Sequence, residues 1–189
     1  MEIGKTLYAP SRKEWHDWLV KNHAKEKEIW LVYYRKASGK PRIDYNDVVD
    51  EALCFGWIDS IVKGIDDEKF AQRISPRKKT SVLSQLNEER IRKLISEKRM
   101  TDVGLAAVAH VFDPISDAGR FKFPADILKA IRKNKKAWEN FEKLPEHYKR
   151  IRVAYIARQR EHNKDAFERS LATFIKKTEE NKRFGFVRD

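Results

Sequence analysis

The loop from Ser75 to Ser81 reads SPRKKTS and carries the residue types that bind anions. Three consecutive cations, residues 77–79, are followed by hydroxyl groups just before a predicted helix. Helix amino termini present free backbone amides to phosphate, and an arginine such as Arg77 adds two parallel hydrogen bonds. Asn87 would project from the first turn of that helix. The same residues also fit a solvated basic turn in which a serine caps the helix, and both interpretations stay open.

A second group of polar side chains belongs to two strands that precede this loop. Trp57 and Asp59 lie two residues apart, so they share one face of their strand. Asp59 is expected to pair with Arg73 or Arg77 on the returning strand. Such a pair is either structural or the polar anchor of a pocket. The sequence therefore predicts a ligand-binding cleft made of six residues: Trp57, Asp59, Arg73, Arg77, Ser81 and Asn87.

The single cysteine, Cys54, is the obvious candidate for a nucleophile. A reactive thiol needs a lowered pKa, which a helix amino terminus or a nearby base provides. Cys54 instead lies near the predicted carboxyl end of a helix, where the helix dipole opposes a thiolate. Its neighbours Leu53 and Phe55 are apolar. We therefore expect a small, buried thiol.

Motifs for metals and cofactors are missing from the sequence. The five histidines lack the spacing of a zinc site, and Walker, GxGxxG and GxSxG loops are absent. We name no catalytic residue, no metal and no cofactor, and we expect a protein that is not an enzyme. An enzyme that uses a cleft of Trp57, Asp59 and an arginine remains an alternative.

The C-terminal third offers a different binding surface, because lysines and arginines dominate the polar faces of its predicted helices. Cations on helices neutralise phosphates and make binding strongly dependent on salt. Trp138, Tyr148 and Tyr155 are expected to fill the helical core rather than stack on bases. The alternative function is thus nucleic-acid binding, through residues that include Lys129, Arg132, Lys133, Lys136 and Arg150, with Arg152 on the same polar faces.

The predicted elements explain how these side chains are positioned. Ser11 and Glu14 have the spacing of a capping box at the start of a helix. Residues 29–35 are β-branched and aromatic on both alternating sets, which indicates a strand buried on both faces. Asp44 can cap a second helix, which Gly56 ends.

An antiparallel hairpin follows this helix. Its strands run from 57 to 63 and from 69 to 74, and Pro76 ends the pairing because it has no amide hydrogen. A third helix covers about 84–98, and Thr101 can cap a fourth. Beyond them, residues 124–141, 145–160 and 164–181 read as three helices.

The predicted fold class is therefore α+β, with a small antiparallel sheet packed with helices and a C-terminal three-helix module. We place the first domain at residues 1–112, a linker at 113–123, where prolines and a glycine cluster, and the helical basic module at 124–189.

The composition fits a partner with negative charge. The 189 residues carry a net charge of +12, and such a field favours polyanions, anionic surfaces or acidic partners. Residues 113–189 contribute +8 of this charge, with 20 basic against 12 acidic residues. A single cysteine fits a reducing compartment, and the sequence shows no signal peptide and no apolar stretch long enough for a membrane span. We expect a cytoplasmic protein without integral membrane association.

Several stretches together resemble the YdeI/OmpD-associated family, whose members are also described as bacteriocin-protection proteins. In the first domain they are WHDWL (15–19), IWLVYY (29–34), ALCFGWIDS (52–60) and RISPRK (73–78). The second domain is similar to the helical module of that family at Pro124, Ile127, Leu128, Ala130, Asn134, Ala137, Phe141, Tyr148 and Ile156. One departure is Lys98, where the family pattern has a glycine at a helix end.

This resemblance implies a role in survival of cationic antimicrobial peptides and bacteriocins, with no catalytic reaction attached. A protein with a charge of +12 would repel cationic peptides rather than sequester them, so we expect an indirect, cytoplasmic route. The leading hypothesis is a non-enzymatic binding protein of stress resistance that recognises an anionic ligand or partner. The sequence leaves its ligand and oligomeric state open.

Overall fold

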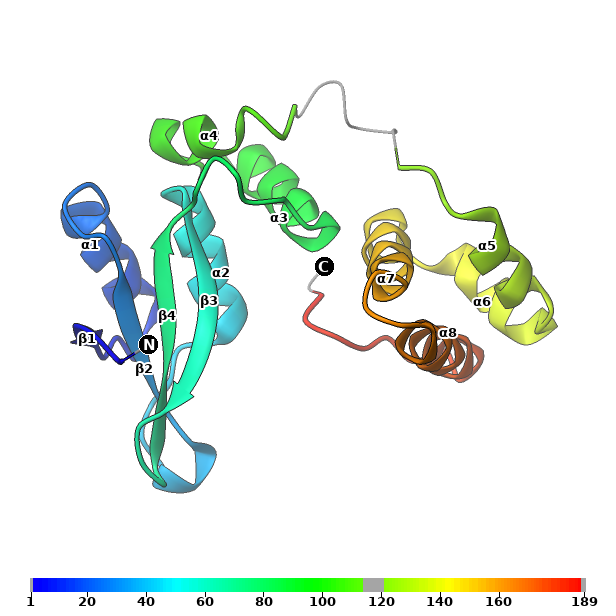
Figure 1. Cartoon of the computed structure of the whole chain (residues 1–189), viewed down its shortest axis with the longest axis horizontal. Helices are drawn as coiled ribbons and strands as arrows, with labels where there is room; N and C mark the ends of the chain where they lie inside the picture. The colour runs from blue at the N-terminus through cyan, green and yellow to red at the C-terminus, as the bar shows by residue number, and fades with distance from the viewer. Residues whose placement is uncertain (1, 114–120, 188–189) are drawn as a thin grey trace. The chain divides into compact units, whose positions relative to one another are not determined.

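The chain divides into two units in a computed structural model that describes residues 2–113 and 121–187 (Figure 1). One unit comprises Met1–Leu83 and Arg90–Phe112, and the other comprises Ser84–Glu89 and Asp113–Asp189. The α+β class is confirmed. Most of the predicted linker, 114–120, lies outside the described residues, so the linker boundaries stay a prediction.

The first unit is built on a sheet with strand order β1-β2-β4-β3. The strands are β1 (Thr6–Leu7), β2 (Ile29–Tyr34), β3 (Trp57–Gly64) and β4 (Lys69–Pro76). The hairpin β3–β4 and the pair β2–β4 are antiparallel, whereas β1 runs parallel to β2. The sheet is thus mixed rather than purely antiparallel, because a two-residue edge strand that the sequence did not reveal joins β2.

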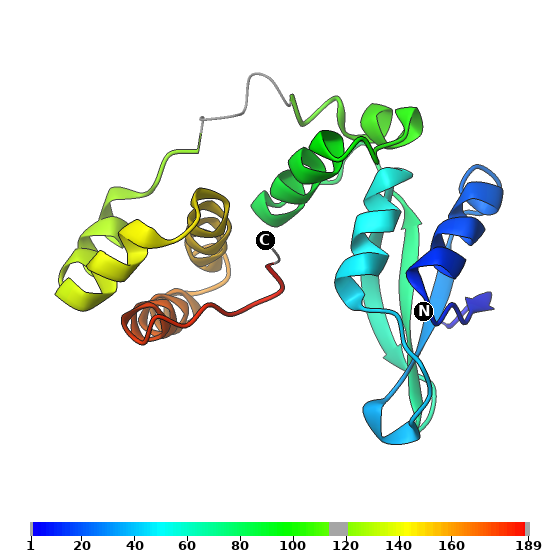
Figure 2. The same ribbon diagram turned by 180° about the vertical axis from the view of Figure 1, so that it is seen from behind.

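Helices α1 (Arg12–Asn22) and α2 (Tyr45–Cys54) cover one face of this sheet (Figure 2). Their apolar side chains pack on the covered face of the sheet. The helices contribute Trp15, Leu19 and Val48, and the sheet contributes residues such as Leu31 and Ile74. Strand β2 is buried over most of its length on both faces, as predicted. A short 3-10 helix, η1 (Lys36–Ser38), follows β2.

The helix ends follow local sequence rules. Ser11 and Glu14 form the expected capping box, and the side chains of Asp44 and Thr101 accept backbone amide hydrogens at the starts of α2 and α4 (Asp102–Val108). Each of these caps joins residues two or three positions apart, so tertiary contacts are not needed to form them.

The end of α3 (Gln85–Ser96) adopts a left-handed turn without a glycine. Lys98 has φ +56°, its amide donates to Ile95 O, and the amide of Arg99 donates to Leu94 O. These two bonds define a Schellman motif. Although Lys98 stands where the family pattern has a glycine, the left-handed turn is still formed.

Glycines allow α4 to lie directly on the end of α2. Gly56 has φ +71°, and a Cβ on Gly104 would lie 2.2 Å from Cys54 O. Thr101 closes the same contact, because its Oγ1 donates to Cys54 O at 2.5 Å. The backbone of α4 therefore packs directly on the end of α2 at Cys54, where the thiol is buried.

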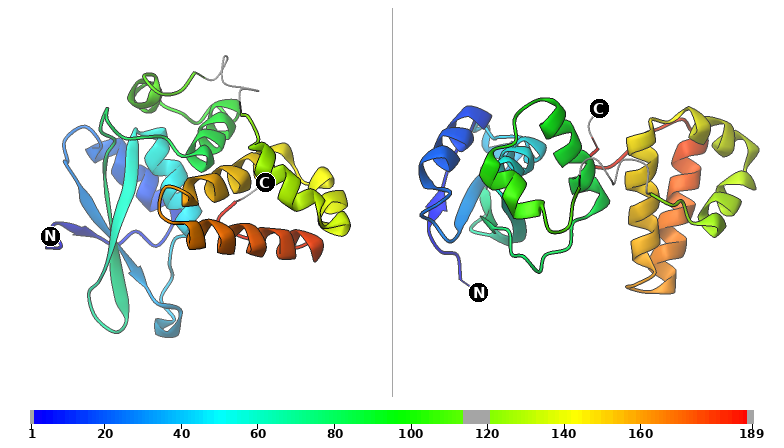
Figure 3. Two further views of the ribbon diagram at one scale, coloured as in Figure 1. Left: turned by 45° about the vertical axis from the view of Figure 1, so that its right-hand side comes forward. Right: turned by 90° about the horizontal axis from the view of Figure 1, so that it is seen from above.

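The second unit contains four helices within residues 121–187: α5 (Ala125–Arg132), α6 (Lys135–Lys143), α7 (Glu146–Gln159) and α8 (Lys164–Glu179). Three were expected. The predicted helix 124–141 is interrupted because the Asn134 side chain accepts the Ala137 amide and starts a new helix. Helices α7 and α8 lie side by side (Figure 3). The core of this unit gathers Ile127, Ile131, Ala137, Phe141, Tyr148, Val153, Ile156 and Phe174.

Candidate functional site

Within the first unit, the side chains of the predicted cleft bind separate partners instead of converging. Asp59 accepts hydrogen bonds from Tyr45 Oη at 3.0 Å and Gln72 Nε2 at 2.7 Å. The expected pairing of Asp59 with Arg73 or Arg77 is wrong. In the hairpin Asp59 stands opposite Ile74, and neighbouring strand residues point to opposite faces, so Arg73 projects from the other side of the sheet.

Arg73 is already paired on that other face. Its Nη2 lies 2.6 Å from Glu28 Oε2, and its Nη1 is within 3.4 Å of the hydroxyl groups of Ser60 and Ser75. The hydrogen bond from Arg73 lowers the pKa of Glu28. The positive charge of Arg73 is therefore balanced without a ligand.

Trp57 is a core residue rather than the wall of a pocket. It is almost fully buried, donates from Nε1 to His23 O at 3.2 Å and meets Trp18 edge to face. Asn87 belongs to the stretch 84–89 that clusters with the second unit, and its backbone amide donates to Ser84 Oγ. Trp57 therefore lacks the exposure that the cleft hypothesis requires, and Asn87 belongs to the other unit.

Arg77 is buried, with 9% of its surface exposed. Its Nη2 donates to the backbone carbonyl of Ser81 at 2.9 Å, so Ser81 contributes its main chain and not its hydroxyl group. Within the described residues, Nε and Nη1 of Arg77 have no hydrogen-bond partner, and burial lowers the pKa of this guanidinium. These two nitrogens are enclosed by protein atoms, so Arg77 holds the loop rather than an external anion.

Cys54 behaves as the sequence predicted. It is buried, and burial together with the nearby charges of Glu51 and Asp50 raises the pKa of its thiol to about 12. A thiolate is therefore scarce at neutral pH. Among the described residues, no cluster of three His, Cys, Asp or Glu side chains could hold a metal ion.

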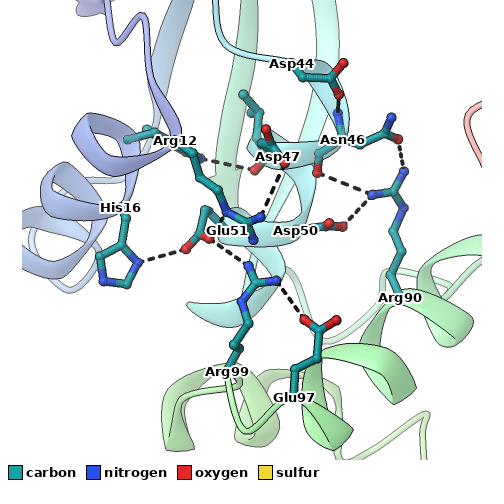
Figure 4. Close-up of polar contacts among 12 residues, drawn as sticks. Arg12, His16, Asp44, Asn46, Asp47, Asp50, Glu51, Arg90, Glu97 and Arg99 are labelled. Carbon is teal, nitrogen blue, oxygen red and sulfur yellow. Dashed lines mark hydrogen bonds and ion pairs between the residues drawn. The ribbon is translucent and has the colours of Figure 1, made fainter. Parts of the chain in front are cut away.

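A charged network on α2 was not anticipated (Figure 4). Glu51 is 5% exposed and accepts from Arg12 Nε at 2.6 Å and Arg99 Nη2 at 2.7 Å, with His16 Nδ1 2.8 Å away. Arg90 binds the neighbouring Asp50. The signal in the sequence was the acidic series Asp47, Asp50 and Glu51, which helical spacing places on one side of α2. Because the charges balance one another, the network joins α1, α2 and the turn after α3 rather than presenting a free group.

The second unit contains a cavity of about 300 Å³ beside α7 and α8. It is lined by Arg152, Tyr155, Arg169, Ser170, Thr173 and Phe184. Arg152 and Tyr155 are three residues apart on α7, and Arg169 and Thr173 are four apart on α8, so each pair shares a helix face. None of these six lining residues is acidic.

Arg152 is the unusual residue of this cavity. It is 9% exposed, its Nε has no hydrogen-bond partner among the described residues, and burial lowers its pKa. Its guanidinium carbon lies 4.0 Å from the ring centroid of Phe184 and 5.1 Å from that of Tyr155. Gly185, at φ +92°, leaves room for it, since a Cβ there would lie 3.1 Å from Nη1.

Two expectations about α7 need correction. Arg152 was assigned to a solvated polar face, and Tyr155 to the helical core. The structure buries Arg152 and leaves Tyr155 49% exposed. Helix α7 carries cations on its buried side as well, Lys149 among them, so its apolar periodicity is too weak to tell one face from the other.

The residues of the alternative nucleic-acid surface divide into two groups. Lys129, Arg132, Lys133 and Lys136 are solvent-exposed around the end of α5 and the start of α6. Arg150, in contrast, forms a bidentate pair with Glu89 inside the second unit. No helix in the described part of the chain has the length and apolar character that crossing a membrane requires.

Comparison with known proteins finds a family match for each part of the chain. Residues 7–107 match a family described as a domain of unknown function (DUF8412). Residues 120–181 match the family described as bacteriocin-protection, YdeI or OmpD-associated, which is the family that the sequence resembled. No curated protein and no solved structure matches the chain at a significant level. The helical module carries the confirmed resemblance, and the cleft motifs lie in the part that matches the domain of unknown function.

Proposed function

Because the chain belongs over residues 7–107 to the DUF8412 family and carries a bacteriocin-protection, YdeI or OmpD-associated domain over residues 120–181, we propose that it is a binding protein whose helical module recognises an anionic ligand. The ligand enters the cavity between α7 and α8. The proposal keeps the class of ligand that the sequence indicated and moves the site from the sheet to the helices.

One observation carries this proposal: Arg152 is buried, has no carboxylate partner among the described residues and lines a cavity. A buried charge is costly unless it is paired or hydrogen-bonded. The aromatic rings of Phe184 and Tyr155 offset part of this cost. Arg152 lines the cavity together with a second cation, Arg169, which makes no ion pair with the described residues. An anion would neutralise both.

Titration calorimetry with inorganic phosphate tests the site directly. The wild-type protein should bind, and Arg152→Gln should weaken binding about thirtyfold or more, because a buried charged pair is lost. Arg158→Gln is the matched control: it removes the same charge from an exposed position on α7 and should leave the affinity nearly unchanged. Equal affinities of the wild type and Arg152→Gln would contradict the proposal.

The physiological role follows the description of the helical family and is also a proposal. We propose that anion binding supports bacterial survival of bacteriocins or cationic peptides from the cytoplasm. The net charge of +12 supports an indirect route, because the protein would repel such peptides. A strain that lacks the protein should regain tolerance with the wild-type chain and not with Arg152→Gln. Full tolerance with that variant would show that anion binding in the cavity is not needed for survival.

A further inference from the structure

Two aromatic rings beside Arg152 limit the directions from which a ligand can approach it. Phe184 and Tyr155 both contact the guanidinium through their rings, at 4.0 and 5.1 Å from its carbon atom. A ring over the face of a guanidinium leaves the planar edge, with its parallel N–H groups, as the part that can reach a ligand. An oxoanion in the cavity would therefore bind the N–H groups of Arg152 rather than the faces that the rings contact.

The other polar groups of the cavity exceed what a carboxylate can use. Arg169, Ser170 and Thr173 all come from α8 and line the same cavity. Together with Arg152 they offer two guanidinium edges and two hydroxyl groups, whereas a carboxylate has two oxygens and a single charge. A phosphate monoester has three terminal oxygens and a charge of about −1.5 to −2 at neutral pH. Its charge and its acceptors match this set of donors.

The volume of the cavity also exceeds the volume of a single phosphate group. Its volume of about 300 Å³ is at the lower end of the range for small-molecule sites, well above the space that one phosphate group fills. The rest of the lining is aromatic, and Tyr155 is the more exposed ring, with 49% of its surface accessible. Exposed aromatic rings next to a phosphate-binding group are suited to stacking on a nucleobase.

We propose that the cavity binds a nucleoside monophosphate, with the phosphate held by Arg152, Arg169, Ser170 and Thr173 and the base against Tyr155. This inference rests on the proposed function and names the ligand of the same site. It concerns a single nucleotide, because the donors converge on one cavity rather than along a groove.

The test compares four probes on the full-length protein: inorganic phosphate, ribose 5-phosphate, AMP and a phosphoserine peptide. AMP should bind about tenfold more tightly than ribose 5-phosphate, as expected for one stacked base. Tyr155→Leu should remove this preference, so that AMP and ribose 5-phosphate bind that variant with equal affinity. Tyr155→Phe keeps the ring and should keep the preference, and circular dichroism checks that each variant is folded.

The outcomes separate the two proposals. If phosphate binds through Arg152 but AMP binds no better than ribose 5-phosphate, the nucleotide is excluded and the anion site stands. Tighter binding of the phosphoserine peptide than of AMP would replace the nucleotide by a phosphorylated protein. If none of the four probes binds, both proposals fail.

Discussion

Three arginines that are partly or fully buried differ in what balances their charge. Arg99 reaches a buried carboxylate, Glu51, at 2.7 Å. Arg77 uses one backbone carbonyl, and Arg152 uses two aromatic rings. Only Arg152 of these three also lines a cavity with a second cation. Arginine therefore has three roles here, which its neighbours determine. Arg99 connects helices, Arg77 holds a loop, and Arg152 is a candidate for binding a ligand.

Lys98 permits a prediction at the scale of one residue. It is exposed and has φ +56°, a conformation that costs a non-glycine residue about 1–2 kcal/mol. Lys98→Gly should raise the free energy of unfolding by about 0.5–1 kcal/mol, since glycine loses part of this gain through its unfolded-state entropy. Urea denaturation measures the change.

The matched control is Lys93→Gly, the same substitution inside α3. There the backbone is right-handed, so glycine should lower the free energy of unfolding by about 1 kcal/mol. Destabilisation by both changes would show that the Lys98 turn is not strained.

At the scale of elements, the acidic side of α2 determines how the helices of the first unit are joined. Glu51 connects α2 to Arg12 and His16 on α1 and to Arg99 after α3. Gly104 then brings α4 against the carboxyl end of α2, where any side chain would meet the carbonyl of Cys54. Helix α2 is thus the element on which the other helices of this unit are assembled.

Glu51→Gln tests this assignment. The amide keeps the shape of the side chain but removes the charge that Arg12 and Arg99 share, and each arginine keeps only its second partner, Asp47 or Glu97. The free energy of unfolding should therefore fall by about 2 kcal/mol. This loss is smaller than the roughly 3–5 kcal/mol typical of a fully buried pair, because Arg12 and Arg99 are partly exposed. Thermal and urea denaturation should agree.

The comparison variant is Asp17→Asn, which breaks the exposed pair with Lys13 on α1. It should leave stability nearly unchanged, because exposed pairs contribute little. An equally small effect of Glu51→Gln would mean that the network is dispensable for the fold.

At the scale of the whole molecule, the charge excess lies in the C-terminal part, where residues 113–189 carry +8 of the total +12. Lys129, Lys133 and Lys136 contribute an exposed cluster that is separate from the six residues of the cavity. Such a surface supports a second candidate function, non-specific binding of nucleic acid, by charge alone.

Salt titration of binding to mixed DNA and RNA tests this surface. Affinity should fall steeply with salt, and replacing the three lysines by glutamine should lower the slope of log K against log salt by about one unit per lost phosphate contact. The affinity for AMP should change little in that variant. A slope that the triple replacement does not alter would remove nucleic acid as a partner of these helices.

The sequence by itself determined the local features of this protein. The caps at Ser11, Asp44 and Thr101, the doubly buried strand β2 and the β3–β4 hairpin all depend on residues close together along the chain. The buried thiol of Cys54 also followed, from the helix end at Gly56. An anionic partner, which the net charge of +12 indicates, stays a prediction.

Only the tertiary structure decided which polar side chains meet. The register that sets Asp59 opposite Ile74 sends Arg73 to the other face, and a shift of one residue would have reversed this result. Arg152 and Tyr155 exchanged their expected places because the rotation of α7 against α8 is set by packing, and α7 lacks a clear apolar stripe. The site depends on such long-range contacts, whose geometry no short stretch of sequence encodes.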